Sequence, residues 1–295
     1  MKNTIIALAL IIILVVGGYF LFKQAPEPTE PTDQTPTTTP VTGPVEQKTE
    51  TVIGDSVQGR DIVAYHYGEG DTKLLFVGGI HGGYEWNTVL VARELMEYLD
   101  ENESAIPEGV EVTVVPVLNP DGLAKVVSDI DDFAAADVAA SQDVVVSGRF
   151  NANNVDLNRN FDCGWQATGV WQNKPVSGGS KAFSEPESRA MRDFVASYQP
   201  DAVVVWYSAA GGVYASTCDG KPVAAETTTL TNTFATASGY PAFQSFDFYE
   251  TTGDMVNWLA KNNIPAISVL LTNHTDIEWT KNLAGAEAVL ELYAK

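Results

Sequence analysis

From residue 51 onward, short apolar runs alternate with segments in which apolar residues recur at helical spacing. The short runs are typical of buried strands, and the periodic segments are typical of helices. "NPDG" at residues 119–122 predicts a turn, and Ser184 with Glu187 has the spacing of a helix cap. We expect strands at 62–67, 73–79, 110–118, 201–207 and 264–271, and helices at 87–100, 184–199, 253–263 and 282–295.

This order of elements predicts an α/β fold. Continuous apolar strands that alternate with helices indicate a mostly parallel, twisted mixed sheet with helices on both faces. In such sheets, binding sites form beyond the carboxyl ends of the strands. Nearly every polar cluster of this chain follows a predicted strand, so we expect these clusters to meet at one edge of the sheet.

The first fifty residues have a different pattern. Residues 4–22 are apolar and uncharged, which is long enough to span a bilayer as a helix. A cleaved signal peptide is the alternative, although no A-x-A site follows. Proline, threonine and acids then dominate, which predicts a disordered stalk. We expect three parts: a membrane anchor or signal segment at 1–23, a Pro/Thr-rich linker at 24–50 and a globular domain at 51–295. The domain would be membrane-anchored and extracytoplasmic, or secreted if the first segment is cleaved.

Charge and cysteine content narrow the function further. The formal net charge is −21 at pH 7, and nearly all of the excess lies after residue 50. Such a surface repels phosphate backbones, so we expect no nucleic acid partner. Cys163 and Cys218 are the two cysteines of the chain. Outside the cytosol they could pair as a disulfide, and two buried thiols are the alternative.

Two clusters carry residues suited to chemistry. His81 and Glu85 follow the strand at 73–79, and imidazole with carboxylate is a common zinc-binding combination. Residues 148–165, "GRFNANNVDLNRNFDCGW", contain Arg149, Asn158 and Arg159. The planar guanidinium of arginine matches a carboxylate. A polar loop is the alternative interpretation of each cluster.

The ordered motifs "GGIHGGYEWN", "VLNPDG", "NANNVDLNRNF" and "EPES" resemble the zinc carboxypeptidase family related to carboxypeptidase A. The resemblance covers residues 51 to 295. It implies zinc held by His81 and Glu85, a C-terminal carboxylate held by Asn158 and Arg159, and a peptide or peptidoglycan stem peptide as the partner. By the same resemblance, Arg149 polarises the scissile carbonyl. Tyr249 would cap the substrate, with Phe248 as the alternative.

The chain departs from the family pattern at three places. The usual spacing in the family is H-x-x-E, and here one extra residue lies between His81 and Glu85. The two glycines between them would allow a bulge that absorbs it. Tyr207 stands where the third ligand, a histidine, is expected. Leu270 stands where the catalytic glutamate is expected, and leucine can neither activate water nor carry a proton.

The few residues that could substitute are His66, His274 and Glu278. His274 follows the last predicted strand and could face the site, whereas Glu278 is more simply an acid at a helix start. We therefore keep three hypotheses. The domain is a zinc carboxypeptidase with an unusual site, or a non-catalytic relative that binds peptide or peptidoglycan ends, or a structural ectodomain. Zinc would bind more weakly than at a three-ligand site, or not at all.

Overall fold

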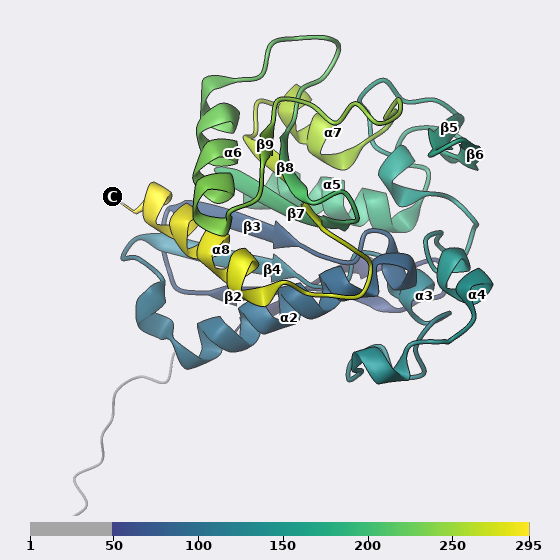
Figure 1. The fold of residues 1–295 in the computed structure, drawn as a ribbon, viewed down its shortest axis with the longest axis horizontal. Helices are drawn as coiled ribbons and strands as arrows, with labels where there is room; N and C mark the ends of the chain where they lie inside the picture. The colour runs from purple at the N-terminus through teal and green to yellow at the C-terminus, as the bar shows by residue number, and fades with distance from the viewer. Residues whose placement is uncertain (1–48, 295) are drawn as a thin grey trace, which may run out of the picture. The chain divides into compact units, whose positions relative to one another are not determined.

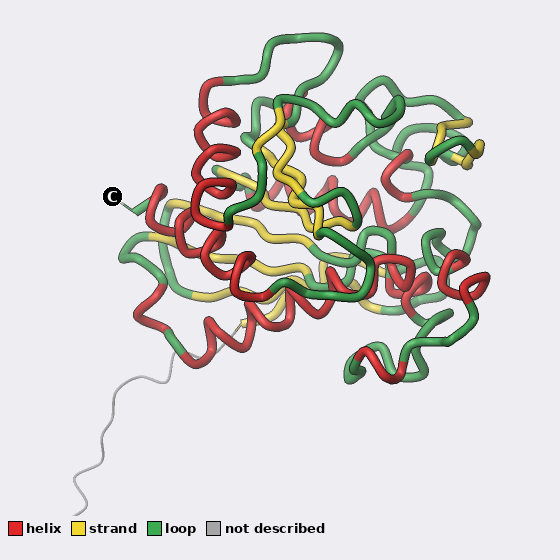
Figure 2. The backbone as a smooth tube through the Cα atoms, in the orientation of Figure 1, coloured by secondary structure: helices red, strands yellow, loops and turns green. Residues whose placement is uncertain are grey.

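The computed structural model describes residues 49–294. Their central element is an eight-stranded sheet in the order β1-β2-β4-β3-β7-β10-β8-β9 (Figures 1 and 2). Strands β4, β3, β7 and β10 pair in parallel, while β1, β2 and β8 are joined through antiparallel pairs. The strands are β1 (Thr49–Asp55), β2 (Asp61–Tyr67), β3 (Thr72–Val77), β4 (Val110–Val115), β7 (Ala202–Ser208), β8 (Gly212–Ala215), β9 (Ala242–Phe243) and β10 (Ala266–Leu271).

Helices cover both faces of this sheet. One apolar core lies between the sheet and α2, α6 and α8, and a second lies between the sheet and α5 and α7 (Figure 1). The bounds of these helices are α2 (Trp86–Glu101), α5 (Pro186–Tyr198), α6 (Ala225–Ser238), α7 (Met255–Lys261) and α8 (Trp279–Tyr293). The predicted α/β class, with a mixed sheet between two helical layers, is therefore confirmed for the described domain.

Smaller elements complete the domain beside the sheet. They are the short helices α3 (Pro120–Leu123) and α4 (Gln142–Ser147), the 3-10 helices η1 (Gly82–Glu85), η2 (Glu103–Ala105), η3 (Ala135–Asp137) and η4 (Leu157–Arg159), and a hairpin of β5 (Thr168–Trp171) and β6 (Lys174–Ser177). The segment predicted as a turn at 119–122 is mostly the helix α3, whose start is capped by the Asn119 side chain.

The central strands of the sheet are fully buried, which explains why their sequences are continuous apolar runs. Every residue of β7 and of β10 is buried, as expected for parallel strands covered on both faces.

The predicted cap at Ser184 is wrong: α5 begins at Pro186, and Glu185 occupies the cap position without a side-chain cap hydrogen bond. The Ser184 hydroxyl donates to the Glu185 carboxylate instead.

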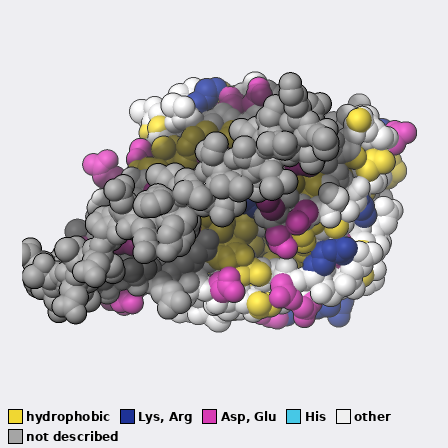
Figure 3. Space-filling model, turned by 90° about the horizontal axis from the view of Figure 1, so that it is seen from below, with side chains coloured by type: hydrophobic (Ala, Val, Ile, Leu, Met, Phe, Trp, Pro, Cys, Tyr) yellow, Lys and Arg dark blue, Asp and Glu magenta, His cyan; other side chains and the backbone are white. Residues whose placement is uncertain are grey.

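The predicted anchor and almost all of the predicted linker lie outside the described residues. Strand β1 begins at Thr49, two residues before the expected start of the domain. Within the described residues, no helix has the length and apolar character needed to cross a membrane. Figure 3 shows acidic side chains spread over the visible part of the domain, with basic side chains among them, rather than one continuous basic surface.

Candidate functional site

A cavity of about 410 Å³ opens at the carboxyl ends of the parallel strands. His81 and Glu85 follow β3, Tyr207 lies near the end of β7, and Leu270 lies near the end of β10. The structure therefore brings the predicted site residues to one place, as expected for an open α/β sheet. Asn158, Arg159, Arg149 and Tyr249 also line this cavity.

His81 and Glu85 form a buried pair despite the extra residue between them. Nδ1 of His81 lies 2.9 Å from Oε1 of Glu85, and both side chains are at most 4% exposed. The 3-10 helix η1 accommodates the insertion, and Gly82 has a positive φ of 45°. A Cβ atom at Gly82 would come within 2.7 Å of the Gly148 carbonyl oxygen. Glycine therefore allows the bulge, as the sequence predicted.

Asp156 lies on the far side of the His81 ring. Its Oδ1 atom is 3.4 Å from His81 Nε2, while its Oδ2 atom accepts from Arg149 Nε at 2.9 Å. Burial alone would raise the pKa of Asp156, but the Arg149 guanidinium and the His81 ring hold it well below its ordinary value. A carboxylate behind a histidine orients the ring and leaves the other nitrogen for a ligand.

Arg149 is held against Asp156 at one edge of the cavity. Its Nε and a terminal nitrogen both contact Asp156 at 2.9 Å, and its guanidinium lies 4.5 Å from the centre of the Trp171 ring. A second terminal nitrogen is 3.9 Å from Glu85 Oε1. The cavity is therefore lined by an arginine with a fixed orientation.

Asn158 and Arg159 lie on η4, which Asp156 caps by accepting from the Asn158 backbone N–H. Asn158 Nδ2 donates to Asp254 at 2.8 Å. Arg159 is 1% exposed, and its three nitrogens donate to the carbonyl oxygens of Val170 and Asn158. Both side chains therefore reach the cavity from a rigid support.

The loop after β9 packs against η4 at Gly253. A Cβ atom there would lie 2.3 Å from the Arg159 carbonyl oxygen, so no larger residue fits without movement. The Phe161 backbone N–H donates to the Gly253 carbonyl oxygen at 3.0 Å. On the same loop, Tyr249 faces the cavity with its ring centre 5.8 Å from the Arg159 guanidinium, whereas Phe248 is 64% exposed. Of the two candidates for the substrate-capping residue, Tyr249 is the one that lines the cavity.

Tyr207 and Leu270 are register partners on adjacent parallel strands. The Tyr207 hydroxyl donates to Asn158 Oδ1 at 3.3 Å, and its ring centre is 5.7 Å from that of His81. Burial, followed by the charges of Asp254 and Glu85, raises the pKa of Tyr207 well above its ordinary value. Leu270 is 7% exposed and presents only carbon to the cavity.

Of the three possible substitutes, His274 contacts Ser208, which lines the cavity, whereas His66 and Glu278 contact residues away from it. His274 Nδ1 is 2.8 Å from the Ser208 hydroxyl, and burial lowers its pKa. Glu278 accepts from Thr272, Tyr240 and Lys281 at the start of α8. His66 on β2 contacts Thr113 and Glu111. None of these three lines the cavity.

The donor set does not fit a three-ligand zinc site. His81 Nδ1 and Glu85 Oε1 are close enough to share one ion, and Glu85 Oε2 has no hydrogen-bond partner among the described residues. A third strong ligand is missing, because a phenol with a raised pKa keeps its proton. Across residues 49–294, His, Cys, Asp and Glu come together as a possible metal-binding trio only at Cys163, Cys218 and Asp219.

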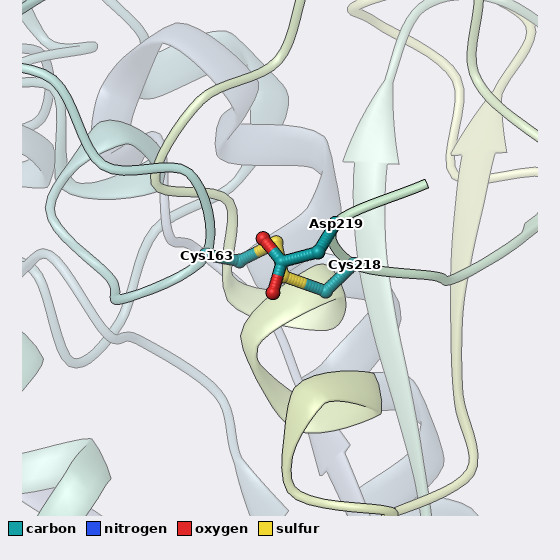
Figure 4. A group of neighbouring side chains, drawn as sticks. All are labelled: Cys163, Cys218 and Asp219. Atoms are coloured by element: carbon teal, nitrogen blue, oxygen red, sulfur yellow. A yellow bond between two sulfur atoms is a disulfide. The ribbon is translucent and has the colours of Figure 1, made fainter. Parts of the chain in front are cut away.

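That trio is a disulfide with a neighbouring acid. Cys163 and Cys218 are bonded, with 5.9 Å between their Cα atoms. Figure 4 shows the Asp219 carboxylate beside the two sulfur atoms. Disulfide sulfurs are not thiolate ligands, so the trio offers no metal site. The disulfide joins the loop after η4 to the segment after β8. The sequence left open whether the two cysteines form a disulfide or are buried thiols, and in the structure they are bonded.

Sequence reasoning missed several residues of this site. Asp156, which contacts His81, lies inside the motif "VDLNRNF", two residues before Asn158. Its place in this motif was the sequence signal that could have identified it as a site residue. Asp254, which caps α7 and accepts from Asn158, follows Gly253 in the sequence and carried no separate signal. Trp171 comes from a short hairpin that the hydrophobic pattern did not indicate.

The fold and this arrangement of residues define a metallocarboxypeptidase-like domain. Residues 46–283 match the sequence model of the zinc carboxypeptidase family, and the chain belongs to that family. Zinc is the metal of this family.

Two relatives match about half of the chain. Bacteriocin BCN5 of Clostridium perfringens is 30% identical over 148 residues, covering 49% of this chain and 15% of the relative. A zinc carboxypeptidase of Simulium vittatum is 31% identical over 153 residues, covering 49% of this chain and 47% of the relative. The match therefore spans less than half the length of either relative.

Solved structures share the fold at lower identity. Murein-tripeptide amidase MpaA from Escherichia coli O157 has a TM-score of 0.56 at 21% identity, covering 82% of this chain and 90% of that one. Carboxypeptidase A from Helicoverpa armigera has a TM-score of 0.63 at 19% identity, covering 83% and 66%. At these identities the likeness shows the fold alone.

Proposed function

We propose that this domain binds the free C-terminus of peptides and hydrolyses them slowly or not at all. The observation that carries the proposal is the composition of the cavity. Asn158 and Arg159 line it as potential carboxylate donors, while Tyr207 and Leu270 stand where a metal ligand and a proton-carrying base are expected.

Arg159 keeps donors for a ligand. An arginine has five N–H groups, and the contacts of Arg159 to Val170 and Asn158 leave one N–H on each terminal nitrogen. Asn158 Nδ2 has a second N–H beyond its bond to Asp254. A carboxylate that reaches these buried donors would form charge-assisted hydrogen bonds, which are stronger than neutral ones.

Hydrolysis lacks its usual support in this cavity. Leu270 cannot take a proton from water, and a general base typically contributes about 10²–10⁴-fold to a rate. Tyr207, with its raised pKa, is a neutral donor rather than a metal ligand. Loss of both functions separates binding from turnover, which favours a peptide-binding protein over an efficient peptidase.

Peptidoglycan stem peptides are the ligand class that we favour. The murein-tripeptide amidase has the same fold and acts, by its name, on a murein peptide. The pair of Asn158 and Arg159, which we call the carboxylate clamp, would recognise only the carboxylate, so it would accept any peptide with a free end.

The retained pair of His81 and Glu85 favours a second function, hydrolysis with an altered metal site. Nδ1 of His81 and Oε1 of Glu85, 2.9 Å apart, are close enough to bind one ion after a small shift, and Asp156 lies behind His81 as a carboxylate that can orient the ring. A structural role with no ligand is the remaining alternative from the sequence.

One experiment separates the three functions. The protein, supplied with zinc, is titrated with a tripeptide that ends in a free carboxylate and with its C-terminal amide, and the peptide is then recovered and weighed by mass spectrometry. We expect tighter binding of the free acid and an intact peptide. Rapid release of the terminal residue that stops on chelation would establish the peptidase instead. Equal affinity for both peptides would leave the structural role.

We also propose that the domain is membrane-anchored and lies outside the cytoplasm. The apolar segment at 4–22 and the disulfide, which is stable in oxidising compartments, support this location. Protease added to intact cells should release a soluble domain by cutting within residues 24–48. Protection in intact cells, with cutting only after lysis, would contradict the proposal.

A further inference from the structure

Tyr207 connects two parts of the cavity. Its ring faces His81 at 5.7 Å between centres, and its hydroxyl reaches Asn158 Oδ1 at 3.3 Å. The side chain is buried, and burial raises its pKa, so the hydroxyl keeps its proton and donates. A phenol oxygen lies farther from the backbone than either imidazole nitrogen. The Tyr207 hydroxyl therefore reaches past the place of an imidazole nitrogen and contacts Asn158 instead.

The orientation of the Asn158 amide follows from its neighbours. The Met255 backbone N–H lies 3.0 Å from Oδ1 and can only donate, so the atom that it contacts must be the oxygen. The nitrogen faces the Asp254 carboxylate at 2.8 Å. Since Tyr207 shares the oxygen with Met255, the second N–H of Asn158 stays available at the cavity wall.

Tyr207 holds this amide from a different element than the other partners do. Met255 and Asp254 both belong to the start of α7, so they fix Asn158 to that helix alone. Tyr207 comes from β7, in the middle of the sheet. Its hydroxyl therefore links the amide to the rigid centre of the domain.

We propose that Tyr207 is a positioning residue of the carboxylate clamp. It donates to Asn158 Oδ1 and holds the amide nitrogen where its remaining N–H meets the carboxylate of the ligand. The inference rests on the proposed binding of C-terminal carboxylates. Tyr207, which stands in the place of the third metal ligand, would therefore have a role of its own in binding the peptide.

The test uses Tyr207→Phe, which removes the hydroxyl and keeps the ring. The readout is the affinity of a tripeptide free acid divided by that of its C-terminal amide, measured by calorimetric titration with the full chain. We expect this ratio to fall about fivefold, the typical net effect of one hydrogen bond. Tyr240→Phe is the matched control: it also removes a tyrosine hydroxyl that donates a hydrogen bond, to Glu278 at 2.8 Å, and Tyr240 does not line the cavity. The control should leave the ratio unchanged.

A double-mutant cycle separates positioning from general destabilisation. If Tyr207 acts through Asn158, then Tyr207→Phe has no further effect on the ratio in an Asn158→Ala background. Independent, additive effects would overturn the inference, as would an unchanged ratio in Tyr207→Phe. A wild-type protein that binds acid and amide equally would refute the proposed function, and this inference with it. Discrimination by the wild type that survives Tyr207→Phe would refute the inference alone.

Discussion

Tyr207 and Leu270 lie opposite each other on β7 and β10, and both line the cavity. Neither side chain disturbs the fold around it: both are buried, and both pack in the core beneath α5 and α7. Because Asn158 and Arg159 line the same cavity, placing histidine and glutamate at these two positions is a defined test at the residue scale.

Tyr207→His should raise the zinc content of the purified protein, because imidazole adds a third ligand beside His81 and Glu85. Hydrolysis should require Leu270→Glu as well, since glutamate supplies the base. We expect the double variant to cleave a free-acid tripeptide at least about a hundredfold faster than Tyr207→His alone. Metal analysis after dialysis and release of the terminal amino acid are the measurements. One tightly held zinc per wild-type chain would contradict this account.

At the same scale, spacing along the chain predicted which residues meet, but contacts set what each one does. His81 and Glu85 could be located because they follow a strand end, and Asn158 and Arg159 because they lie in a dense motif. The bond from Tyr207 to Asn158 joins positions 49 residues apart, so no local pattern indicates it. The same holds for the contact between Asn158 and Asp254.

Among the elements, the central strands and α2, α5, α7 and α8 were predictable from apolar periodicity. Helix α6 was missed because threonine, a weak helix former, fills much of "AETTTLTNTFATAS". Burial of Leu230 and Phe234 against the sheet overrides that propensity, and Gly239 ends the helix in the left-handed region. Strands β8 and β9 have four and two residues, which is too short for a clear pattern.

The contacts of Glu278 at the start of α8 predict how the stability of the fold depends on pH. Glu278, the spare carboxylate of the sequence, accepts from Thr272, Tyr240 and Lys281. Partial burial alone would raise the pKa of Glu278, but these hydrogen bonds lower it to about 2 from an ordinary value of 4.5. A carboxylate with a lowered pKa in the folded state stabilises the fold above its unfolded pKa, and the effect is lost as the pH falls.

The thermal midpoints of wild type and Glu278→Gln should therefore differ most above pH 4.5 and converge as the pH falls towards about 2. Tyr240→Phe removes one of the donors and should give an intermediate pH dependence. Thermal unfolding followed by circular dichroism from pH 2 to pH 6 is the measurement. A gap between wild type and Glu278→Gln that stays constant over this range would show that the contacts of Glu278 do not depend on its charge.

For the whole molecule, the disulfide is the strongest single constraint on the unfolded chain. Cys163 and Cys218 are 55 residues apart, and closing a loop of that length corresponds to about 4 kcal/mol in the chain-entropy description. The double variant Cys163→Ala/Cys218→Ala should lose free energy of unfolding of this order in a denaturant titration. Wild type treated with a reductant serves as the control and should lose a similar amount. A change below about 1 kcal/mol would contradict the entropic account.

The central claim is that the domain holds a terminal carboxylate through Arg159. The most direct measurement is the ratio of affinities for a tripeptide acid and its amide in wild type, Arg159→Ala and Arg159→Lys. Arg189→Ala, at an exposed arginine of α5, is the control. We predict that the wild type prefers the acid about tenfold or more, that Arg159→Ala abolishes the preference, and that Arg159→Lys, which lacks the planar fork, restores it in part. An acid preference in Arg159→Ala as large as in the wild type and in Arg189→Ala would contradict the claim.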